Sequence, residues 1–402
     1  MTTTGSRVSN LTKSWADDAA PVWSPDGRRI AFVSWRDTLA GKWSLGHGTI
    51  YLMDFDPGSG TGGGNVTRLT STKTQDGWPT WSPNGQRIAL ERERGANRDI
   101  WVITLDGSGP IHLTTDPADD RHPSWSPDGT KIAFTSNREG NDDIWVMNAN
   151  GSGKVNLTPS TTGIQDFDPA WSPDGKKIAF VSNRAGSPDI YVMNPDGTNV
   201  TNITNNPTAW DDELAWSPDG SMIAFMSRRD GLYNNVYVMN ADGSNQRALT
   251  NSSVTKLGTA WSPDGKHISF SSWENYNADL WMMDPDGSNL GHLTDNPAEE
   301  WWGEWQSVNR LPSATDDGPF YVRPGGTLLG ATVLANDEDP DGEALTAKLE
   351  SGPAHASTFV LHADGQFYYD HDGSAALSDS FTYRVEDTRS GGSAPATVTI
   401  HV

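Results

Sequence analysis

Short apolar segments alternate with polar turns along the chain, and the alternation recurs in nearly the same form six times. One copy, PSWSPDGTKIAFTSNREGNDDIWVMNANGSGKVNLT, covers residues 123–158 and contains four apolar segments, PSW, KIAFTS, DIWVMN and VNLT. In the second segment Ile132 and Phe134 should lie on one face of a strand and Ala133 on the other. DIWVM is apolar on both faces, which predicts a strand packed between two sheets.

Turn chemistry separates the segments. SPDG places Pro and Asp centrally and Gly last, which predicts a hairpin turn with glycine in the left-handed region. NANGSG, NPDGTN and NADGSN separate the third and fourth segments in three of the copies. Each copy is therefore expected to form one four-stranded antiparallel sheet.

The spacing of the copies indicates how these sheets assemble. The tryptophan of the WSPDG motif stands at positions 23, 81, 125, 171, 216 and 261, and Trp305 follows without the rest of the motif. One four-stranded sheet in about 45 residues is typical of a β-propeller blade. We expect six blades, with RVSNLT (7–12) and EWQS (304–307) fastening the ring; an incomplete seventh blade is the alternative.

The repeated unit PxWSPDGxxIAF…DIWVM…DG…LT resembles the TolB-type, WD-like propeller repeat from residue 8 to about residue 307. After NRLPSATDDG the repeat stops, and strands such as QFYYD, SFTYRVED and ATVTIHV predict a small β-sandwich. TVLANDEDPDGEALTAKL and DGQFYYDHDGSAALSDSFTYRVED resemble the bacterial cadherin-like or Ig-like adhesin domain. The predicted domains are a six-bladed propeller, 1–309, and a sandwich, 310–402, both all-β.

The loop NDEDPDG of the second domain offers oxygen ligands from Asn336, Asp337, Asp339 and Asp341. Calcium takes six to eight such oxygens, and the cadherin-like resemblance places Asp387 near the same site. The resemblance implies that calcium stiffens the domain. A solvated acidic loop without metal is the alternative.

Composition narrows the possible partners and compartments. The net charge of −23 argues against nucleic acid and anionic membranes as partners. No apolar run is long enough for membrane insertion, no signal peptide is visible, and the absence of cysteine excludes disulfides. We expect a monomeric bacterial protein that is secreted or lies at the cell surface.

Two charged positions recur on one side of the propeller, which we call the top face: the loops before PxW and after IAFxS. The first series is Asp18, Asp76, Asp120, Asp166 and Asp211, then Lys256; the second is Arg36, Arg94, Arg138, Arg184 and Arg229, then Glu274. Because both signs change in the same unit, we interpret the two series as ion pairs within each blade. A ring of aspartates that binds a cation is the alternative.

Acids and tryptophans outside these pairs provide the candidate ligand site. The acids to which the repeat assigns no partner are Asp17, Asp119, Asp168, Asp212, Glu213, Glu299, Glu300 and Glu304. We select Trp78, His122, Trp210, Asp212, Glu213, Trp301, Trp302 and Glu304 as ligand-binding residues of the top face. Such a rim suits a glycan, by ring stacking, or a protein or basic peptide; the indoles could instead only cover blade edges.

Catalysis is the minority hypothesis. The G-x-S-x-G elbow of propeller-bearing peptidases is absent, and His47 and His122 are too few for a three-histidine metal site. Asp212, Glu213 and Glu304 could still face one another as the carboxylates of a glycosidase. The leading hypothesis is a non-catalytic recognition protein, and the alternative is a carbohydrate-active enzyme, either a polysaccharide lyase or a glycoside hydrolase.

Overall fold

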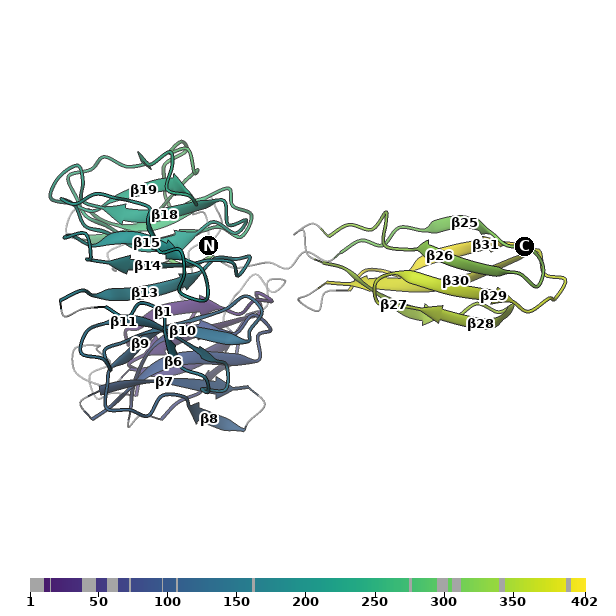
Figure 1. Ribbon diagram of the computed structural model, residues 1–402, viewed down its shortest axis with the longest axis horizontal. Coiled ribbons are helices and arrows are strands. Elements are labelled where there is room, and N and C mark those ends of the chain that lie inside the picture. The colour runs from purple at the N-terminus through teal and green to yellow at the C-terminus, as the bar shows by residue number, and fades with distance from the viewer. Residues whose placement is uncertain are drawn as a thin grey trace. The chain divides into compact units, whose positions relative to one another are not determined.

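A computed structural model describes residues 11–14, 16–37, 48–55, 64–71, 74–95, 97–105, 108–160, 163–274, 277–294, 303–305, 312–339, 344–387 and 392–402. The chain divides into two compact units, Met1–Ser307 and Val308–Val402. The first unit holds six four-stranded sheets within the described residues, and the second holds a four-stranded and a three-stranded sheet. This architecture confirms the predicted all-β propeller and sandwich (Figure 1).

The six sheets follow the six sequence repeats. Blade one contains β1 (Asp18–Trp23), β2 (Arg29–Ser34), β3 (Thr49–Asp54) and β4 (Val66–Arg68). Blade two contains β5 (Gln75–Trp81), β6 (Arg87–Arg94), β7 (Asn97–Thr104) and β8 (Gly109–His112). Blade three contains β9 (Asp120–Trp125), β10 (Lys131–Ser136), β11 (Asp143–Asn148) and β12 (Val155–Asn156).

Blade four contains β13 (Asp166–Trp171), β14 (Ile178–Ser182), β15 (Asp189–Met193) and β16 (Thr201–Asn202). Blade five contains β17 (Asp211–Trp216), β18 (Met222–Ser227), β19 (Asn235–Asn240) and β20 (Arg247–Ala248). Blade six contains β21 (Lys256–Trp261), β22 (Ile268–Glu274), β23 (Asn277–Met283) and β24 (Gly291–His292). Within each blade, consecutive strands pair antiparallel in chain order.

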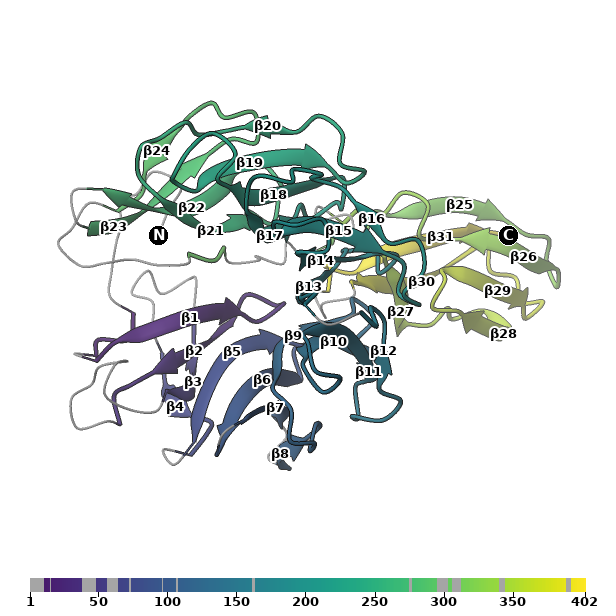
Figure 2. The ribbon, with the colours of Figure 1, turned by 60° about the vertical axis from the view of Figure 1, so that its left-hand side comes forward.

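The innermost strand of each blade is the PxW strand. These strands, β1, β5, β9, β13, β17 and β21, face the middle of the ring, and β1 to β21 contact one another in that order (Figure 2). The glycine of each SPDG-type turn has a positive φ, for example 66° at Gly129, which confirms the predicted hairpin geometry. The SPDG-type turns follow one end of the innermost strands. The variable loops therefore lie at the opposite end of these strands.

Blades pack against each other through the two faces of their middle strands. Ile132 and Phe134 of β10 join a core with Trp125 and Ile100, whereas Ala133 points to the next core, with Trp171. This alternation agrees with the pattern in the sequence. Burial of these side chains supplies the main stabilisation, since each large apolar side chain contributes about 1.5–3 kcal/mol.

Motif tryptophans also link neighbouring blades by hydrogen bonds. The indole N–H of Trp261 donates to the carbonyl oxygen of Ala215 in the preceding blade at 3.1 Å, and Trp305 repeats this bond to Ala260 at 3.2 Å. The backbone N–H of Trp23 in blade one donates to the Glu304 carboxylate at 3.0 Å. Residues 303–305 therefore connect the sixth blade to the first, which agrees with a ring-fastening role for this segment.

The second unit is a sandwich around Tyr369, Phe381 and Tyr383. Its strands are β25 (Asp317–Tyr321), β26 (Thr327–Thr332), β27 (Thr346–Ser351), β28 (Ala356–Leu361), β29 (Gln366–His371), β30 (Ser378–Glu386) and β31 (Ala396–His401). They form one sheet in the order β25-β31-β30-β27 and a second in the order β26-β29-β28. In the described part of the chain, no helix could cross a membrane.

Candidate functional site

The ion pairs predicted for the top face are present in four blades as expected. Arg36, Arg138, Arg184 and Arg229 bind Asp18, Asp120, Asp166 and Asp211 at 3.2, 2.9, 2.7 and 2.7 Å. Each of these guanidinium groups also lies over the aromatic side chain of the third strand, as Arg138 does over Trp145 at 4.5 Å from the ring centroid. These aspartates are therefore structural, which argues against the alternative of a cation-binding ring.

In blade two, the predicted ion-pair partner of Asp76 was wrong. Asp76 binds Arg92, at 2.6 Å, and not Arg94. The other blades with an Asp–Arg pair have serine at the Arg92 position, where it binds the arginine, as Ser136 binds Arg138. Blade two places the arginine directly at that strand position, so Arg94 is left exposed. In blade six, Lys256 donates to Ser272 at 2.6 Å, and the side chain of Glu274 lies outside the described residues.

Each innermost strand contains a bulge two residues after the ion-pair position, and the residue there has a positive φ. These six residues are Ala20, Trp78, His122, Asp168, Glu213 and Gly258, with φ between 47° and 65°. We call them the bulge ring. A left-handed backbone costs a residue other than glycine roughly 1–2 kcal/mol, and only blade six uses glycine here. Five blades thus retain side chains at a position where glycine would be least costly.

Contacts between neighbouring blades join members of the bulge ring. The rings of Trp78 and His122 meet edge to face, with centroids 5.7 Å apart. His122 Nδ1 forms a close ion pair with Asp168, and the two side chains are 32% and 42% exposed. The backbone N–H of Gly258 donates to the Glu213 carboxylate at 2.5 Å. The three sequence-selected residues Trp78, His122 and Glu213 therefore belong to one structural element.

His122 has acidic groups on two sides. Burial lowers the pKa of His122, but the hydrogen bond and charge of Asp168 and the charge of Glu91 outweigh it, so the pKa is raised. The backbone N–H of His122 also donates to Glu91. The acid Glu91, the base His122 and the acid Asp168 thus lie side by side at this point of the bulge ring.

Asp212 and Trp210 extend the site beyond the ring. Burial, and then the charge of Glu213, raise the pKa of Asp212 to about 7, although Arg228 opposes the shift. One Asp212 oxygen, Oδ1, is buried and has no hydrogen-bond partner among the described residues. Trp210 is 44% exposed and lies under the guanidinium of Arg228, with 5.5 Å from that group to the ring centroid.

The remaining selected residues of the top face fall at the end of the propeller sequence. Glu304 stays exposed to solvent yet lies among many protein atoms; this desolvation raises its pKa to about 8, while the Trp23 amide opposes the shift. Trp301 and Trp302 lie outside the described residues. The structure therefore brings together Trp78, His122 and Asp168. The charge of Asp168 also acts on Asp212 and Glu213, which lie with Trp210.

Sequence reasoning missed Glu91 altogether and listed Asp168 without assigning it a role. Each bulge residue stands three positions before the motif tryptophan, so aligning the repeats on that residue would have revealed the series. Glu91 occupies a strand position that holds Val33, Thr135, Val181, Met226 and Ser271 in the other blades. The sequence could have revealed Glu91, because it is a charged residue at a strand position that is neutral in the other five blades.

Acidic residues of the sandwich gather at the end where β25, β27 and β31 begin and β30 ends. The Tyr383 hydroxyl binds Asp317 at 2.7 Å and Asp337 at 3.0 Å. Asp337 accepts the Thr315 amide at 2.8 Å, and Asn336 donates to the Asp316 carbonyl at 3.2 Å. Burial and the charges of Asp337 and Asp316 raise the pKa of Asp317 to about 6, although the Tyr383 hydrogen bond opposes this.

An oxygen-only set of donors with crowded negative charge suits calcium chemically. Among the described residues, however, no three acidic or histidine side chains converge as a metal site. Asp339 and Asp387 are described, and Asp387 is buried; Asp341 lies outside the described residues. The available ligands are therefore of the oxygen type that calcium prefers, but the described side chains do not form a complete coordination site.

Comparison with known proteins identifies both units. Residues 42–166 and 158–302 match the TolB beta propeller domain, and residues 309–402 match the bacterial cadherin-like domain. The chain belongs to the TolB β-propeller family and continues into a bacterial cadherin-like domain.

Relatives resemble only parts of the chain. The Tol-Pal system protein TolB of Alcanivorax borkumensis is 33% identical over 90 residues, 22% of this chain and 18% of that protein. The structure of TolB from Acinetobacter baumannii has a TM-score of 0.53 at 23% identity and covers 70% of this chain and 67% of its own. Oligogalacturonate lyase from Vibrio parahaemolyticus has a TM-score of 0.52 at 15% identity, with coverages of 69% and 77%. These structural similarities show the fold alone.

Proposed function

We propose that this protein is a non-catalytic recognition module whose propeller binds a protein, peptide or glycan at the bulge ring and the adjoining top-face loops. One observation carries the proposal: five blades place a side chain at a strained bulge position where glycine would be least costly. Backbone strain of this kind persists where the side chain is used, and it clusters at ligand sites. Trp78, Trp210 and the acids beside them supply stacking surfaces and negative charge.

The fold of the relatives is compatible with this role without assigning a ligand. The similarity to the Tol-Pal system protein TolB covers one part of the propeller, so a Tol-Pal partner is not transferred to this chain. We propose that the protein acts outside the cytoplasm, secreted or at the cell surface, as a monomer. Its net charge of −23 favours ligands that carry positive charge.

A binding screen tests the recognition role directly. The full chain, applied to a peptide array and a glycan array, should bind a restricted set of ligands. His122→Ala combined with Glu213→Ala should abolish that binding, because it removes two members of the bulge ring. The variant Asp54→Asn, at an exposed carboxylate where β3 ends opposite the top face, is the matched control and should bind like the wild type. Retained binding in the double variant would contradict the assignment of the ring.

A carbohydrate-active enzyme is the second candidate, and a specific observation favours it. Asp212 has a pKa of about 7, and that of the adjacent Glu213 is also raised by burial, so a protonated carboxyl group is available near neutral pH. Incubation with a panel of polysaccharides, polygalacturonate included, should release no new reducing or unsaturated ends if the protein only binds. Products that disappear in the Asp212→Asn variant would establish the enzyme instead.

We also propose that the cadherin-like unit binds calcium at the end that carries Asp316, Asp317, Asp337, Asp339 and Asp387. Calcium would neutralise carboxylates that repel one another there and would stiffen the domain. The acids of this end would hold the ion through their oxygens, as the oxygen preference of calcium requires.

Calcium should raise the melting temperature of the sandwich, and EDTA should lower it. All 18 tryptophans lie in residues 1–305, so fluorescence melting reports on the propeller alone and supplies an internal control. Calorimetry of the full chain should show one transition that moves with calcium, while the fluorescence transition stays fixed. Asp339→Asn should reduce the shift, and magnesium should replace calcium poorly because it demands stricter octahedral geometry. A calorimetric profile that calcium leaves unchanged would contradict the proposal.

A further inference from the structure

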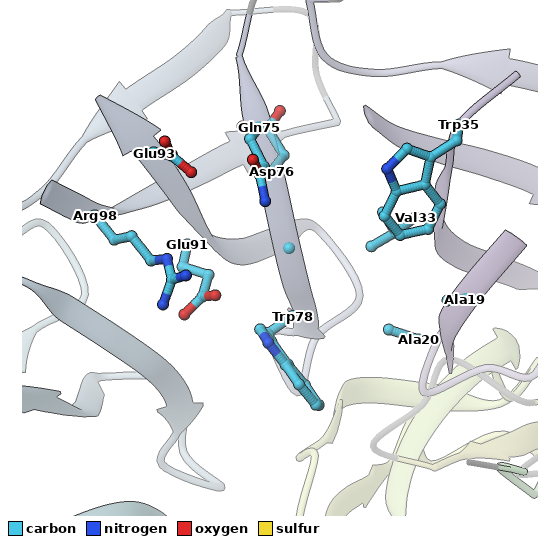
Figure 3. Close-up of a pocket in the computed structure, with 11 residues that line it drawn as sticks. Ala19, Ala20, Val33, Trp35, Gln75, Asp76, Trp78, Glu91, Glu93 and Arg98 are labelled. Atoms are coloured by element: carbon cyan, nitrogen blue, oxygen red, sulfur yellow. The ribbon is translucent and has the colours of Figure 1, made fainter. Parts of the chain in front are cut away.

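A cavity of about 250 Å³ lies between blades one and two, beside the bulge ring. Blade one supplies its apolar side, with Ala20, Val33 and Trp35. Trp78 projects from β5 into the same space (Figure 3). Trp78 is 48% exposed, so the cavity borders on solvent.

Blade two supplies the charged side of the cavity. Glu91 and Glu93 of β6 and Arg98 of β7 line it, and Figure 3 shows them across β5 from Trp35. Asp76 also lines the cavity, but its charge is compensated by Arg92 at 2.6 Å. Glu91 and Glu93 then face Arg98 across the lining; burial raises the pKa of Glu91, and the charges of His122, Arg98 and Arg121 oppose that shift.

Glu91 has a structural role, but that role uses only one of its two carboxylate oxygens. In the neighbouring blade, Thr135 occupies the same position and accepts the backbone N–H of Asp168 at 3.2 Å. Glu91 accepts the backbone N–H of His122 in the same way. A neutral hydroxyl is sufficient for this bond, as Thr135 demonstrates. The carboxylate brings a second oxygen and a charge that the bond does not require.

That second oxygen points to a ligand. Glu91 is 6% exposed, and its Oε2 atom is buried with no hydrogen-bond partner among the described residues. A buried carboxylate oxygen without a partner is costly unless something else supplies a donor. Glu91 lines the cavity, so a donor that enters the cavity can reach this residue.

We propose that this cavity binds the basic side chain of a peptide, with the methylene groups against Val33, Trp35 and Trp78 and the cationic end at Glu91. Long basic side chains combine an apolar stem with a charged tip, which matches a cavity with one apolar and one acidic side. Indole rings add cation–π attraction. The inference rests on the proposed recognition function and specifies its ligand as a basic peptide segment.

A sugar fits the cavity less well. Its hydroxyl groups need hydrogen-bond partners around the whole ring edge, and the methyl groups of Ala20 and Val33 offer none. A neutral apolar side chain would leave Glu91 Oε2 without a donor. A cationic side chain uses both the apolar side of the cavity and the unpartnered oxygen of Glu91.

The test uses the full chain and a minimal probe, Nα-acetyl-lysine methylamide, with Nα-acetyl-norleucine methylamide as its neutral counterpart. Nuclear magnetic resonance of the indole N–H groups, assigned through Trp35→Phe and Trp78→Phe, follows binding. The lysine probe should shift the Trp35 and Trp78 signals saturably and bind about tenfold more tightly than the norleucine probe, since a cation–π contact and a charge pair are added.

Glu91→Gln should remove this preference, while the control variant Asp54→Asn should leave it intact. Because Glu91 is buried, Trp78→Ala serves as a second variant: its side chain is 48% exposed, so the fold should tolerate the change while lysine binding falls. Equal binding of both probes, tighter binding of methyl glucoside at these indoles, or an unchanged preference in Glu91→Gln would overturn the inference. If array ligands still bind Glu91→Gln normally, the recognition function stands and the cavity assignment alone fails.

Discussion

Replacing Arg138 by alanine is expected to lower the free energy of unfolding of the propeller by about 3–5 kcal/mol, the usual result of breaking a buried ion pair. Asp120 is completely buried, and Arg138 binds it at 2.9 Å, binds Ser136 at 2.9 Å and lies over Trp145. Burial raises the pKa of Asp120 even though Arg138 and Ser136 oppose it. Without the guanidinium, Asp120 must either remain a buried, unpaired charge or take up a proton.

The partner substitution should cost less. In Asp120→Ala, Arg138 keeps Asp116 at 3.0 Å and is itself 16% exposed, so its charge stays compensated. Urea unfolding followed by tryptophan fluorescence measures both variants, because the tryptophans report on the propeller only. The double variant should show a coupling of roughly 1 kcal/mol or more, and Glu139→Ala should change stability by no more than about 0.5 kcal/mol. Equal, additive losses would mean that the pair contributes no interaction of its own.

The sequence was sufficient for the propeller because its information is repeated. Each motif tryptophan, turn glycine and buried isoleucine occurs six times, so an error at one position is corrected by the other five. The ion pairs were predictable for the same reason. The exception in blade two arose where the repeat itself changed, with Arg92 in place of a serine, and one altered copy cannot reveal which of two nearby arginines binds Asp76.

The candidate site was harder to predict because its residues differ from blade to blade by nature. Trp78, His122 and Glu213 were selected as polar or aromatic residues of the top face outside the repeated ion pairs. Their shared bulge position depends on backbone geometry that periodicity does not report. Glu91 was hidden inside a strand with an otherwise apolar pattern. The cavity between blades one and two depends on packing across a blade interface, which no local motif encodes.

Asp212 should make a contribution to the stability of the propeller that decreases as the pH rises from about 4 to about 7. The folded chain raises the pKa of Asp212 from 3.8 to about 7, through burial and then the charge of Glu213. Between these values the folded state holds a proton that the unfolded state has released. Stability therefore falls with increasing pH in this window. Each pKa unit corresponds to about 1.4 kcal/mol, but water reaches part of the side chain, so we expect a total of about 1–2 kcal/mol.

Asp212→Asn should remove this contribution. The variant should match the wild type near pH 4 and exceed its stability by about 1–2 kcal/mol at pH 7.5, measured by urea unfolding with tryptophan fluorescence. Other titrating groups, such as Glu304, are present in both proteins and cancel in the difference, and Glu139→Gln should show no such divergence. A difference that stays constant with pH would exclude Asp212 as the source. If the divergence is found, the ionised carboxylate destabilises the ring at neutral pH, and a cationic ligand bound beside it would offset that loss and bind more tightly as the pH rises.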